Sequence, residues 1–509
     1  MLHRVGAIVL GLCFVALGAL VLSDSSLSGD GYEYVLTMHA LWQHGSPNIT
    51  PADVESLRQG AAKVPFYGAT LGDLMPIIQE HLRAPHLSPA FAYTIYPGLN
   101  GQFYGIHFGL YSLLAVPLYA LLPAFPHYAL SLLNLACSAA VYFYLRRVLP
   151  ERPVLPFVLF MVSGTTFYLH WMGPEVLTAS CLLVASIALL RGQAGLAILL
   201  AGVAASQNPP LVMMMPVALA YRFMLHKYPQ LLWPGSTASS SLGSELLLAG
   251  LGLLFALAPF AFSQYVFGVP SVIARDFNDA GLISAARLAS LFFDLNQGML
   301  IGVPGLLLTL VLGVLLVPAQ AKRAWLTVLA VASAALLLMA VPTLSALNWN
   351  SGGVVMTRYS YWLGMPLLAA SLLAARLSTP RRGTLILLSG VALQALLLVS
   401  TGLLGGKTIF IEHSLPARVA LTHFPTLYNP EPEIFHARNQ RHVTLPLPLE
   451  GFSVFAVDGQ PRKIMRHGSN QLAPAGLCPA GGRLMGADVR VGSRGWEYLH
   501  APFTCGKAQ

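Results

Sequence analysis

A succession of long, uncharged apolar segments constrains this chain more than any other feature. Of its 509 residues, 55% are hydrophobic and only 10% are charged. Soluble domains carry about 25% charged residues, so the composition predicts an all-α protein that crosses a membrane many times. The net charge of +9 comes without a Lys/Arg run interleaved with aromatic residues, so it does not indicate a nucleic-acid partner.

The apolar segments predict membrane-spanning helices, since about 20 apolar residues cross a bilayer. The predicted spans are residues 5–22, 127–146, 154–171, 175–190, 194–208, 209–225, 246–267, 298–317, 325–345, 361–376 and 384–404. No small-residue cleavage site follows the first, which is therefore expected to be retained. Asn208-Pro209-Pro210 leaves open whether 194–208 and 209–225 are one kinked helix; we count two.

Residues 106–125 decide the topology. They are uncharged and long enough to span a membrane. If they span it, the chain crosses the membrane twelve times; if they lie at the membrane interface, it crosses eleven times. Cytoplasmic loops are enriched in Lys and Arg. With eleven crossings the basic loops fall on the same side as Arg4, so eleven is predicted. The loop residues that decide are Arg146, Arg147, Arg152, Arg191, Arg222, Lys227, Lys322, Arg323, Arg376, Arg381 and Arg382.

This topology divides the chain into two predicted domains. Residues 1–404 form the membrane region, whose long first outer loop, 23–126, carries a helix at 31–44 and other juxtamembrane helices. Residues 405–509 form a small outer domain, where short alternating segments such as 441–445 and 452–457 predict mostly β structure. A disulfide between Cys478 and Cys505 in this tail would require an oxidising compartment. We expect a bacterial inner-membrane protein whose first loop and tail face the periplasm.

A polar stretch after the first apolar segment carries two carboxylates about one helical turn apart, Asp30 and Glu33. One interpretation is a capping box, with Asp30 as N-cap and Glu33 at the third helical position. The other is catalytic, with Asp30 accepting a proton from an acceptor hydroxyl while a sugar phosphate departs. The two are compatible, because a cap also holds a side chain in place.

Glu175 follows Gly173-Pro174 at the outer end of a predicted span. The helix dipole stabilises a carboxylate at that position, so a structural role competes with acceptor or metal binding. His170 is either an ordinary interfacial residue or a second candidate for the same site. The sequence has no Cys/His spacing typical of a metal site, no P-loop and no nucleotide-binding glycine pattern.

Arg358 lies on the outer side, against the charge bias of the loops. It is either an interfacial Arg whose head reaches water or a guanidinium that binds the phosphate of a lipid donor, with Tyr359 beside it. The charged residues of the outer loop 268–297 are expected to be mostly solvated: Arg275, Asp276, Asp279, Arg287 and Asp294.

Together these motifs resemble the GT-C superfamily of polyprenyl-phosphate-sugar-dependent transferases, which includes the protein O-mannosyltransferases and the aminoarabinose transferases of lipid A. The resemblance covers about residues 1–404. The matching features are Asp30 and Glu33 after the first span, the long outer loop, Glu175, the Trp349-x-x-Gly352-Gly353 motif followed by Arg358 and Tyr359, and the polar tail.

The resemblance implies an inverting transfer on the outer face, with Asp30 as the base or acceptor-orienting group. Many members have adjacent Asp-Glu or Asp-Asp where this chain has Asp-Gly-Tyr-Glu, so a chemical role for Glu33 stays open. Some members use a divalent ion, such as Mg²⁺ or Mn²⁺, and that dependence is also open here.

The predicted function is a hexosyl- or pentosyltransferase that moves a sugar from a polyprenyl-phosphate donor to a lipid, glycan or protein acceptor. The alternatives are a transporter or flippase of lipid-linked glycans and a non-catalytic membrane scaffold. A transporter is expected to place ionisable residues within its spans, whereas the charges here gather at the outer rim.

Overall fold

The computed structural model describes residues 18–19, 27, 29–62, 64–66, 69–83, 94–236, 241–349, 355–402, 411–442, 447–470, 477 and 483–506. The first predicted span, 5–22, therefore lies almost wholly outside the described residues. The chain divides into two compact units. The first comprises Met1–Asp276, Gly305–Met339 and Trp362–Gly406, and the second comprises Phe277–Pro304, Ala340–Tyr361 and Lys407–Gln509. Two segments of the predicted membrane region thus group with the tail, and the predicted domain limits stay a prediction.

The predicted first outer loop folds into short helices around a small sheet. Its elements are α2 Gly31–His44, β1 Asn48–Ile49, α3 Pro51–Ala61, β2 Pro65–Phe66, β3 Ala69–Thr70, α4 Leu71–Arg83, β4 Ile95–Pro97, β5 Phe103–Gly105 and α5 Leu110–Leu121. The helix predicted at 31–44 is confirmed by α2. Strands β1, β5 and β4 form an antiparallel sheet in that order, which joins residues far apart in this loop.

The remaining helices of the membrane region overlap the predicted spans, except α13, which lies in the predicted outer loop 268–297. They are α6 Pro126–Val148, α7 Val154–Phe160, α8 Thr166–Tyr168, α9 Glu175–Leu190, α10 Ala194–Gln207, α11 Met214–Lys227, α12 Leu242–Phe267, α13 Val272–Asp276, α16 Pro304–Leu316, α17 Ala319–Thr343, α18 Arg358–Leu363, α19 Met365–Leu377 and α20 Pro380–Ser400. A tight 3₁₀ turn, Pro209–Met213, separates α10 from α11, as the two-helix interpretation predicts.

Five of the described helices are long and apolar enough to cross a membrane: α6, α12, α17, the α18–α19 run Arg358–Leu377, and α20. Shorter apolar helices accompany them. The chain therefore has the character of a mostly helical membrane protein, whereas the predicted count of eleven crossings is not confirmed.

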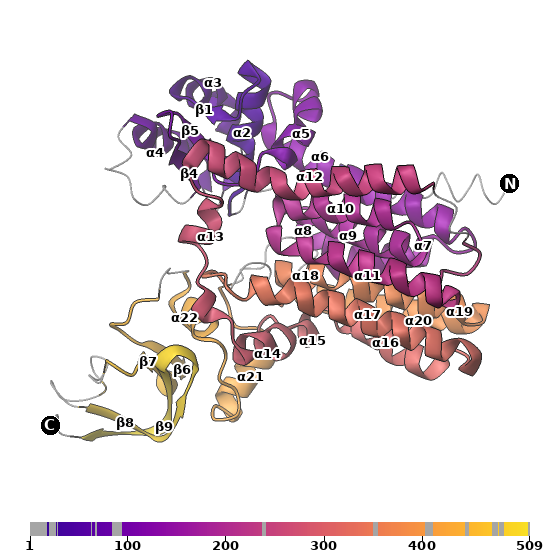
Figure 1. Ribbon diagram of the computed structural model, residues 1–509. Helices are drawn as coiled ribbons and strands as arrows, with labels where there is room; N and C mark the ends of the chain where they lie inside the picture. Colours follow the sequence, from indigo (N-terminus) through magenta and orange to yellow (C-terminus); the bar gives the residue numbers. More distant parts are fainter. Residues whose placement is uncertain are drawn as a thin grey trace. The chain divides into compact units, whose positions relative to one another are not determined.

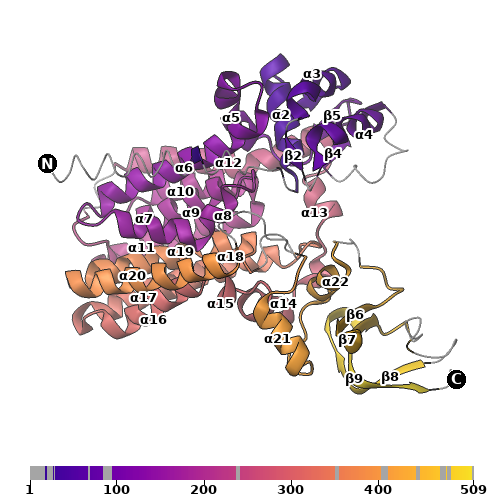
Figure 2. The same ribbon diagram turned by 180° about the vertical axis from the view of Figure 1, so that it is seen from behind.

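Close helix packing builds the centre of the first unit. Every residue of α9 except Val184 is buried, as expected for a helix that is apolar all round. Helix α10 packs against both α9 and α12, and Figures 1 and 2 show α10 alongside α12 from opposite sides. A Cβ on Gly202 would collide with the Gly252 carbonyl oxygen, and one on Gly195 would lie 2.7 Å from the Cα of Glu245. Small residues thus let two backbones meet, as in membrane helix pairs.

The outer helices leave apolar side chains exposed. In α12, Leu247 and Leu254 are more than 60% exposed, and so are Leu315 of α16 and Leu396 and Val399 of α20. Exposed apolar surface on this scale is rare on soluble monomers. It is the surface expected of helices that face lipid.

The second unit contains the tail and two inserted segments. Its elements are α14 Ala285–Phe293, α15 Met299–Gly302, α21 Leu415–His423, α22 Pro432–Gln440, β6 Ser453–Val457, β7 Gln460–His467, β8 Arg483–Val491 and β9 Trp496–Gly506. The antiparallel strand order is β6-β7-β9-β8, so the small β sheet predicted for the tail is confirmed. Of the two predicted segments, 452–457 corresponds to β6, whereas 443–445 lies outside the described residues.

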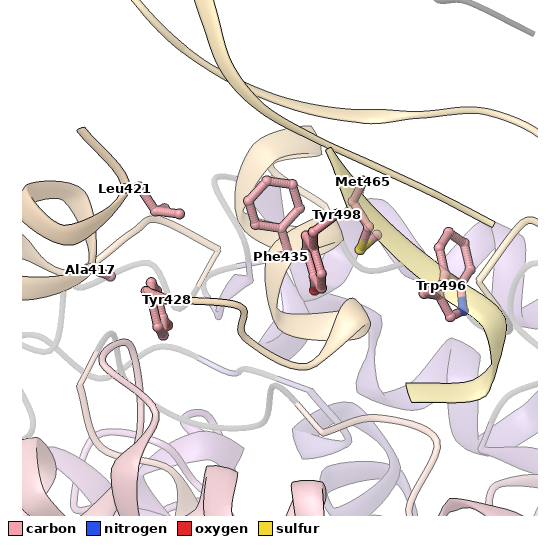
Figure 3. Packing of buried hydrophobic residues seen from close by; sticks show 7 residues of the cluster. All are labelled: Ala417, Leu421, Tyr428, Phe435, Met465, Trp496 and Tyr498. Atoms are coloured by element: carbon pink, nitrogen blue, oxygen red, sulfur yellow. The ribbon is translucent and has the colours of Figure 1, made fainter. Parts of the chain in front are cut away.

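A buried cluster joins helices and sheet in this unit (Figure 3). Phe435 of α22 meets Tyr498 of β9 edge to face, with ring centroids 5.5 Å apart. The cluster consists of Ala417, Leu421, Tyr428, Phe435, Met465, Trp496 and Tyr498. Near the sheet's end, Cys505 is disulfide-bonded; Cys478, its predicted partner, lies outside the described residues.

Candidate functional site

The predicted acidic motif lies at the start of α2. Gly29 has φ +52°, a left-handed conformation that glycine adopts readily, and it turns the chain into the helix. The Asp30 carbonyl oxygen accepts the backbone N–H of Glu33 at 3.0 Å and of Tyr34 at 3.3 Å. The Asp30 side chain makes no capping hydrogen bond. The predicted capping box is therefore wrong, because the main chain of Asp30 caps α2 and both carboxylates serve other contacts.

The Glu33 carboxylate is held by His107. Glu33 has only 1% of its side chain exposed. The His107 backbone N–H donates to its Oε1 at 2.8 Å, and His107 Nδ1 lies 2.8 Å from its Oε2. Hydrogen bonds to a charged acceptor are the stronger kind. Two of them from one residue fix both the carboxylate plane and the imidazole ring.

Gly105 makes room for this carboxylate. A Cβ at Gly105 would lie 2.7 Å from Cγ and 2.9 Å from Cδ of Glu33, and closer still to Oε1. Any larger residue at the end of β5 would push the carboxylate away from its position. The glycine is therefore part of the site, although it contributes no side chain.

The imidazole of His107 also faces Asp30. Its Nε2 lies 3.7 Å from Asp30 Oδ2, and the ring of Tyr34 lies beside it at 5.6 Å between centroids. The Asp30 side chain is 34% exposed and that of His107 is 18% exposed. The site is thus a histidine between a buried carboxylate and one that water reaches.

Burial raises the pKa of Glu33 above its ordinary value. The charge and hydrogen bonds of His107 oppose this shift, and the charge of Asp30 adds to it. Loss of hydration therefore outweighs the favourable contacts of the ionised form. Glu33 holds a proton more tightly than an exposed glutamate does.

Sequence reasoning missed His107. It is the one histidine of residues 106–125, and the only available signal was this single imidazole in a segment assigned to the interface. Nothing local connects it with Glu33, which lies 74 residues earlier.

Glu175 is linked to α2 through the first unit. It is the first residue of α9 and is buried. The ring of Tyr34 meets that of Tyr111 at 5.4 Å, the Tyr111 hydroxyl donates to Asn134 Oδ1 at 3.1 Å, and Asn134 Nδ2 donates to the Gly173 carbonyl at 3.4 Å. Tyr111 also interacts electrostatically with Glu175. These contacts connect the start of α9 with α2, and a shared site of Glu175 with Asp30 and Glu33 stays a prediction.

His170 lies in the turn before α9 and is buried, with 6% exposed. Among the described residues, no group of three or more His, Cys, Asp or Glu side chains could hold a metal ion. Glu175 and His170 thus belong to no such ligand set among the described residues.

Arg358 and Tyr359 belong to the second unit. Arg358 is the first residue of α18 and is half-buried, and its guanidinium lies 5.5 Å from the centre of the Tyr359 ring. Tyr359 in turn stacks on Trp349, with centroids 5.2 Å apart and planes at 19°. Gly352 and Gly353 lie outside the described residues. The predicted meeting of Arg358 with Asp30 stays a prediction.

Arg287 and Asp294 were predicted to be solvated, but both are buried. The Arg287 guanidinium donates to Glu433 at 2.7 Å, lies 3.8 Å from Glu431, and donates to the Leu344 carbonyl at 2.6 Å. These contacts join segments of the second unit that are distant in sequence, so Arg287 is structural. Of the other loop charges, Arg275 and Asp279 are exposed and Asp276 is half-buried.

Comparison with family models, curated proteins and solved structures finds no match to this chain. The expected membership of the GT-C superfamily stays a prediction.

Proposed function

We propose that this chain is an integral-membrane glycosyltransferase of the GT-C type, which transfers a sugar from a polyprenyl-phosphate donor to a hydroxyl of a lipid, glycan or protein acceptor. The observation that carries the proposal is the group formed by Asp30, Glu33 and His107 at the head of α2. A water-accessible carboxylate beside a histidine that a buried carboxylate holds in place is suited to accept a proton during transfer.

In the proposed reaction, the acceptor oxygen attacks the anomeric carbon of the sugar as the bond from that carbon to the donor phosphate breaks. The bonding electron pair leaves with the phosphate, and the acceptor proton passes to the acidic group at α2. Asp30 is the base or orients the acceptor. Arg358 is assigned to the departing phosphate, where a guanidinium is well matched to the developing charge.

The proposed topology has eleven crossings in a bacterial inner membrane, with the site and the tail in the periplasm. The distribution of the basic loops carries this count; helix α5 extends only about 18 Å for its 12 residues, but α10 and α16 are nearly as short, with 14 and 13 residues. A hydrocarbon core is about 30 Å thick. Residues 106–125 would then lie at the interface, and the basic loops would face the cytoplasm.

The test is to incubate the purified protein with a panel of polyprenyl-phosphate sugars and measure acceptor-dependent release of the polyprenyl phosphate. We expect release with at least one donor, and a fall of about 10²-fold or more in the Asp30→Asn variant, as for removal of a general base. His44→Ala, on the same helix, is the matched control and should retain activity. No release with any donor, together with donor movement across vesicles that Asp30→Asn leaves unchanged, would favour a flippase instead.

A further inference from the structure

The proposed reaction assigns no proton-transfer step to His107. The His107 side chain contacts both carboxylates of the acidic motif, at 2.8 Å from Glu33 and 3.7 Å from Asp30. It is 18% exposed, so it lies at the boundary between the buried and the accessible parts of the site.

The contacts of His107 indicate which ring nitrogen carries the proton. An ionised carboxylate only accepts hydrogen bonds, so when Glu33 is ionised its Oε2, at 2.8 Å, requires the proton of the ring to be on Nδ1. In a neutral imidazole the other nitrogen, Nε2, is then the acceptor. Nε2 is the atom that faces Asp30 and the accessible side of the site.

We propose that His107 Nε2, rather than Asp30, takes the proton from the acceptor hydroxyl, with Glu33 as the residue that positions the ring. This inference rests on the proposed function and assigns its proton acceptor. Glu33 selects the tautomer of His107 as the buried carboxylate of a Ser-His-Asp triad does for its histidine. Asp30 then orients the acceptor, and the imidazolium releases its proton to water after the transfer.

The step balances in charge and atoms. The acceptor O–H bond breaks and its proton goes to Nε2, while the acceptor oxygen bonds to the anomeric carbon. The bond from that carbon to the phosphate oxygen breaks, and a phosphodiester donor becomes a phosphate monoester with one further negative charge. The positive charge appears on an imidazolium that lies between Glu33 and Asp30, and both carboxylates stabilise it.

Base strength favours a histidine for this task. Imidazole has a reference pKa near 6.5 and a carboxylate has one near 4, and a base works best when its pKa lies close to the working pH. Glu33, Asp30 and Tyr34 of α2 are among the groups that lie beside the His107 ring.

The kinetic test uses the full-length protein in lipid nanodiscs with an active polyprenyl-phosphate sugar. We expect His107→Ala to lower kcat by about 10² to 10⁴-fold, and added imidazole to restore part of the loss with a pH dependence that follows the pKa of imidazole. A misfolded protein is not rescued by a small base, so rescue also shows that the variant folds. His44→Ala, which removes a histidine paired with Asp53 at 3.2 Å, is the control and should need no rescue.

A second measurement does not depend on activity. In protein labelled with ¹⁵N-histidine, we expect one strongly downfield Nδ1–H resonance that is absent from both His107→Ala and Glu33→Gln. Its absence from the wild type would overturn the positioning role of Glu33.

The two proposals fail in different ways. A wild type that releases no polyprenyl phosphate from any donor refutes the transferase function. An active wild type whose His107→Ala variant keeps kcat within about twofold, or loses it without rescue by imidazole, refutes the role of His107 and leaves the transferase standing.

Discussion

Gly105→Ala is the sharpest test of the site, because it adds one methyl group and changes no charge. In the wild type the end of β5 lies against the Glu33 side chain. The new Cβ would lie 2.7 Å from Glu33 Cγ, whereas carbon atoms attract best at about 3.5–4.0 Å. The carboxylate must therefore retreat by roughly 1 Å or the strand must shift by a similar amount.

A displacement of this size breaks the contact that orients His107. The bond from the His107 backbone N–H to Glu33 Oε1 is 2.8 Å long, and a retreat of about 1 Å takes it beyond hydrogen-bonding range. A hydrogen bond to a charged group contributes about 1.5–3 kcal/mol. If the whole of that energy positions the base, the transfer rate should fall roughly 10- to 150-fold, since about 1.4 kcal/mol corresponds to a factor of ten.

The assay compares transfer rates of Gly105→Ala and Gly109→Ala in the same nanodiscs. A Cβ on Gly109 would meet only the Thr37 methyl, at 3.4 Å, so this control tests the effect of an added methyl group nearby. We expect the first variant to lose activity and the downfield His107 signal, and the second to keep both. If the two variants have the same activity and the same His107 signal, the close packing of Glu33 against Gly105 does not position the residues of the site.

Three further predictions concern charge burial. Arg287→Met should destabilise the protein by up to about 3–5 kcal/mol, because it removes one of the two guanidinium groups that pair with the buried Glu433 and leaves only that of Arg494; the exposed Arg275→Met should change little, and thermal unfolding compares them. Burial, with nearby arginine charge, lowers the pKa of His413 to about 3, so the unfolded chain binds a proton below about pH 6.5 that the fold does not. Stability should then fall from about pH 6.5 toward pH 3, by up to about 1.4 kcal/mol per pH unit, and unfolding of His413→Gln should lack this part of the slope. The raised pKa of Glu33 means that the folded protein binds a proton more tightly than the unfolded chain, so the free energy of unfolding declines as the pH rises through that pKa. Glu33→Gln should remove this decline and abolish activity. A Glu33→Gln protein whose stability has the wild-type pH slope would refute the shift.

The helices were largely predictable because their signal is local. The segment 246–267 falls within α12, Leu242–Phe267, and the prediction of 31–44 coincides with α2. Hydrophobicity over some 20 residues and the caps at helix ends are properties of neighbouring residues. The number of crossings is different, because it depends on how each helix is oriented in a bilayer.

The contacts of the site were not predictable in the same way. Glu33 and His107 lie 74 residues apart, and Arg287 and Glu433 lie 146 apart. The pattern of Asp30 and Glu33 fits a capping box in an isolated helix. The contact of Glu33 with the distant His107 explains why its carboxylate does not cap α2. Loop charges are usually solvated, so nothing in the sequence around Arg287 predicts its burial. The burial depends on contacts with residues of the distant tail.

The small sheet of the first unit explains how so distant a histidine reaches α2. Strand β1 follows α2 after a short turn and pairs with β5, with Asn48 opposite Tyr104. On its other side β5 pairs with β4, with Ile95 opposite Gly105, so both neighbours fix its register. Successive strand residues point to opposite faces. A slip of one residue would therefore replace Gly105 by a side chain at the Glu33 seat and move His107 out of reach, which makes the sheet register as necessary to the proposed chemistry as the carboxylates themselves.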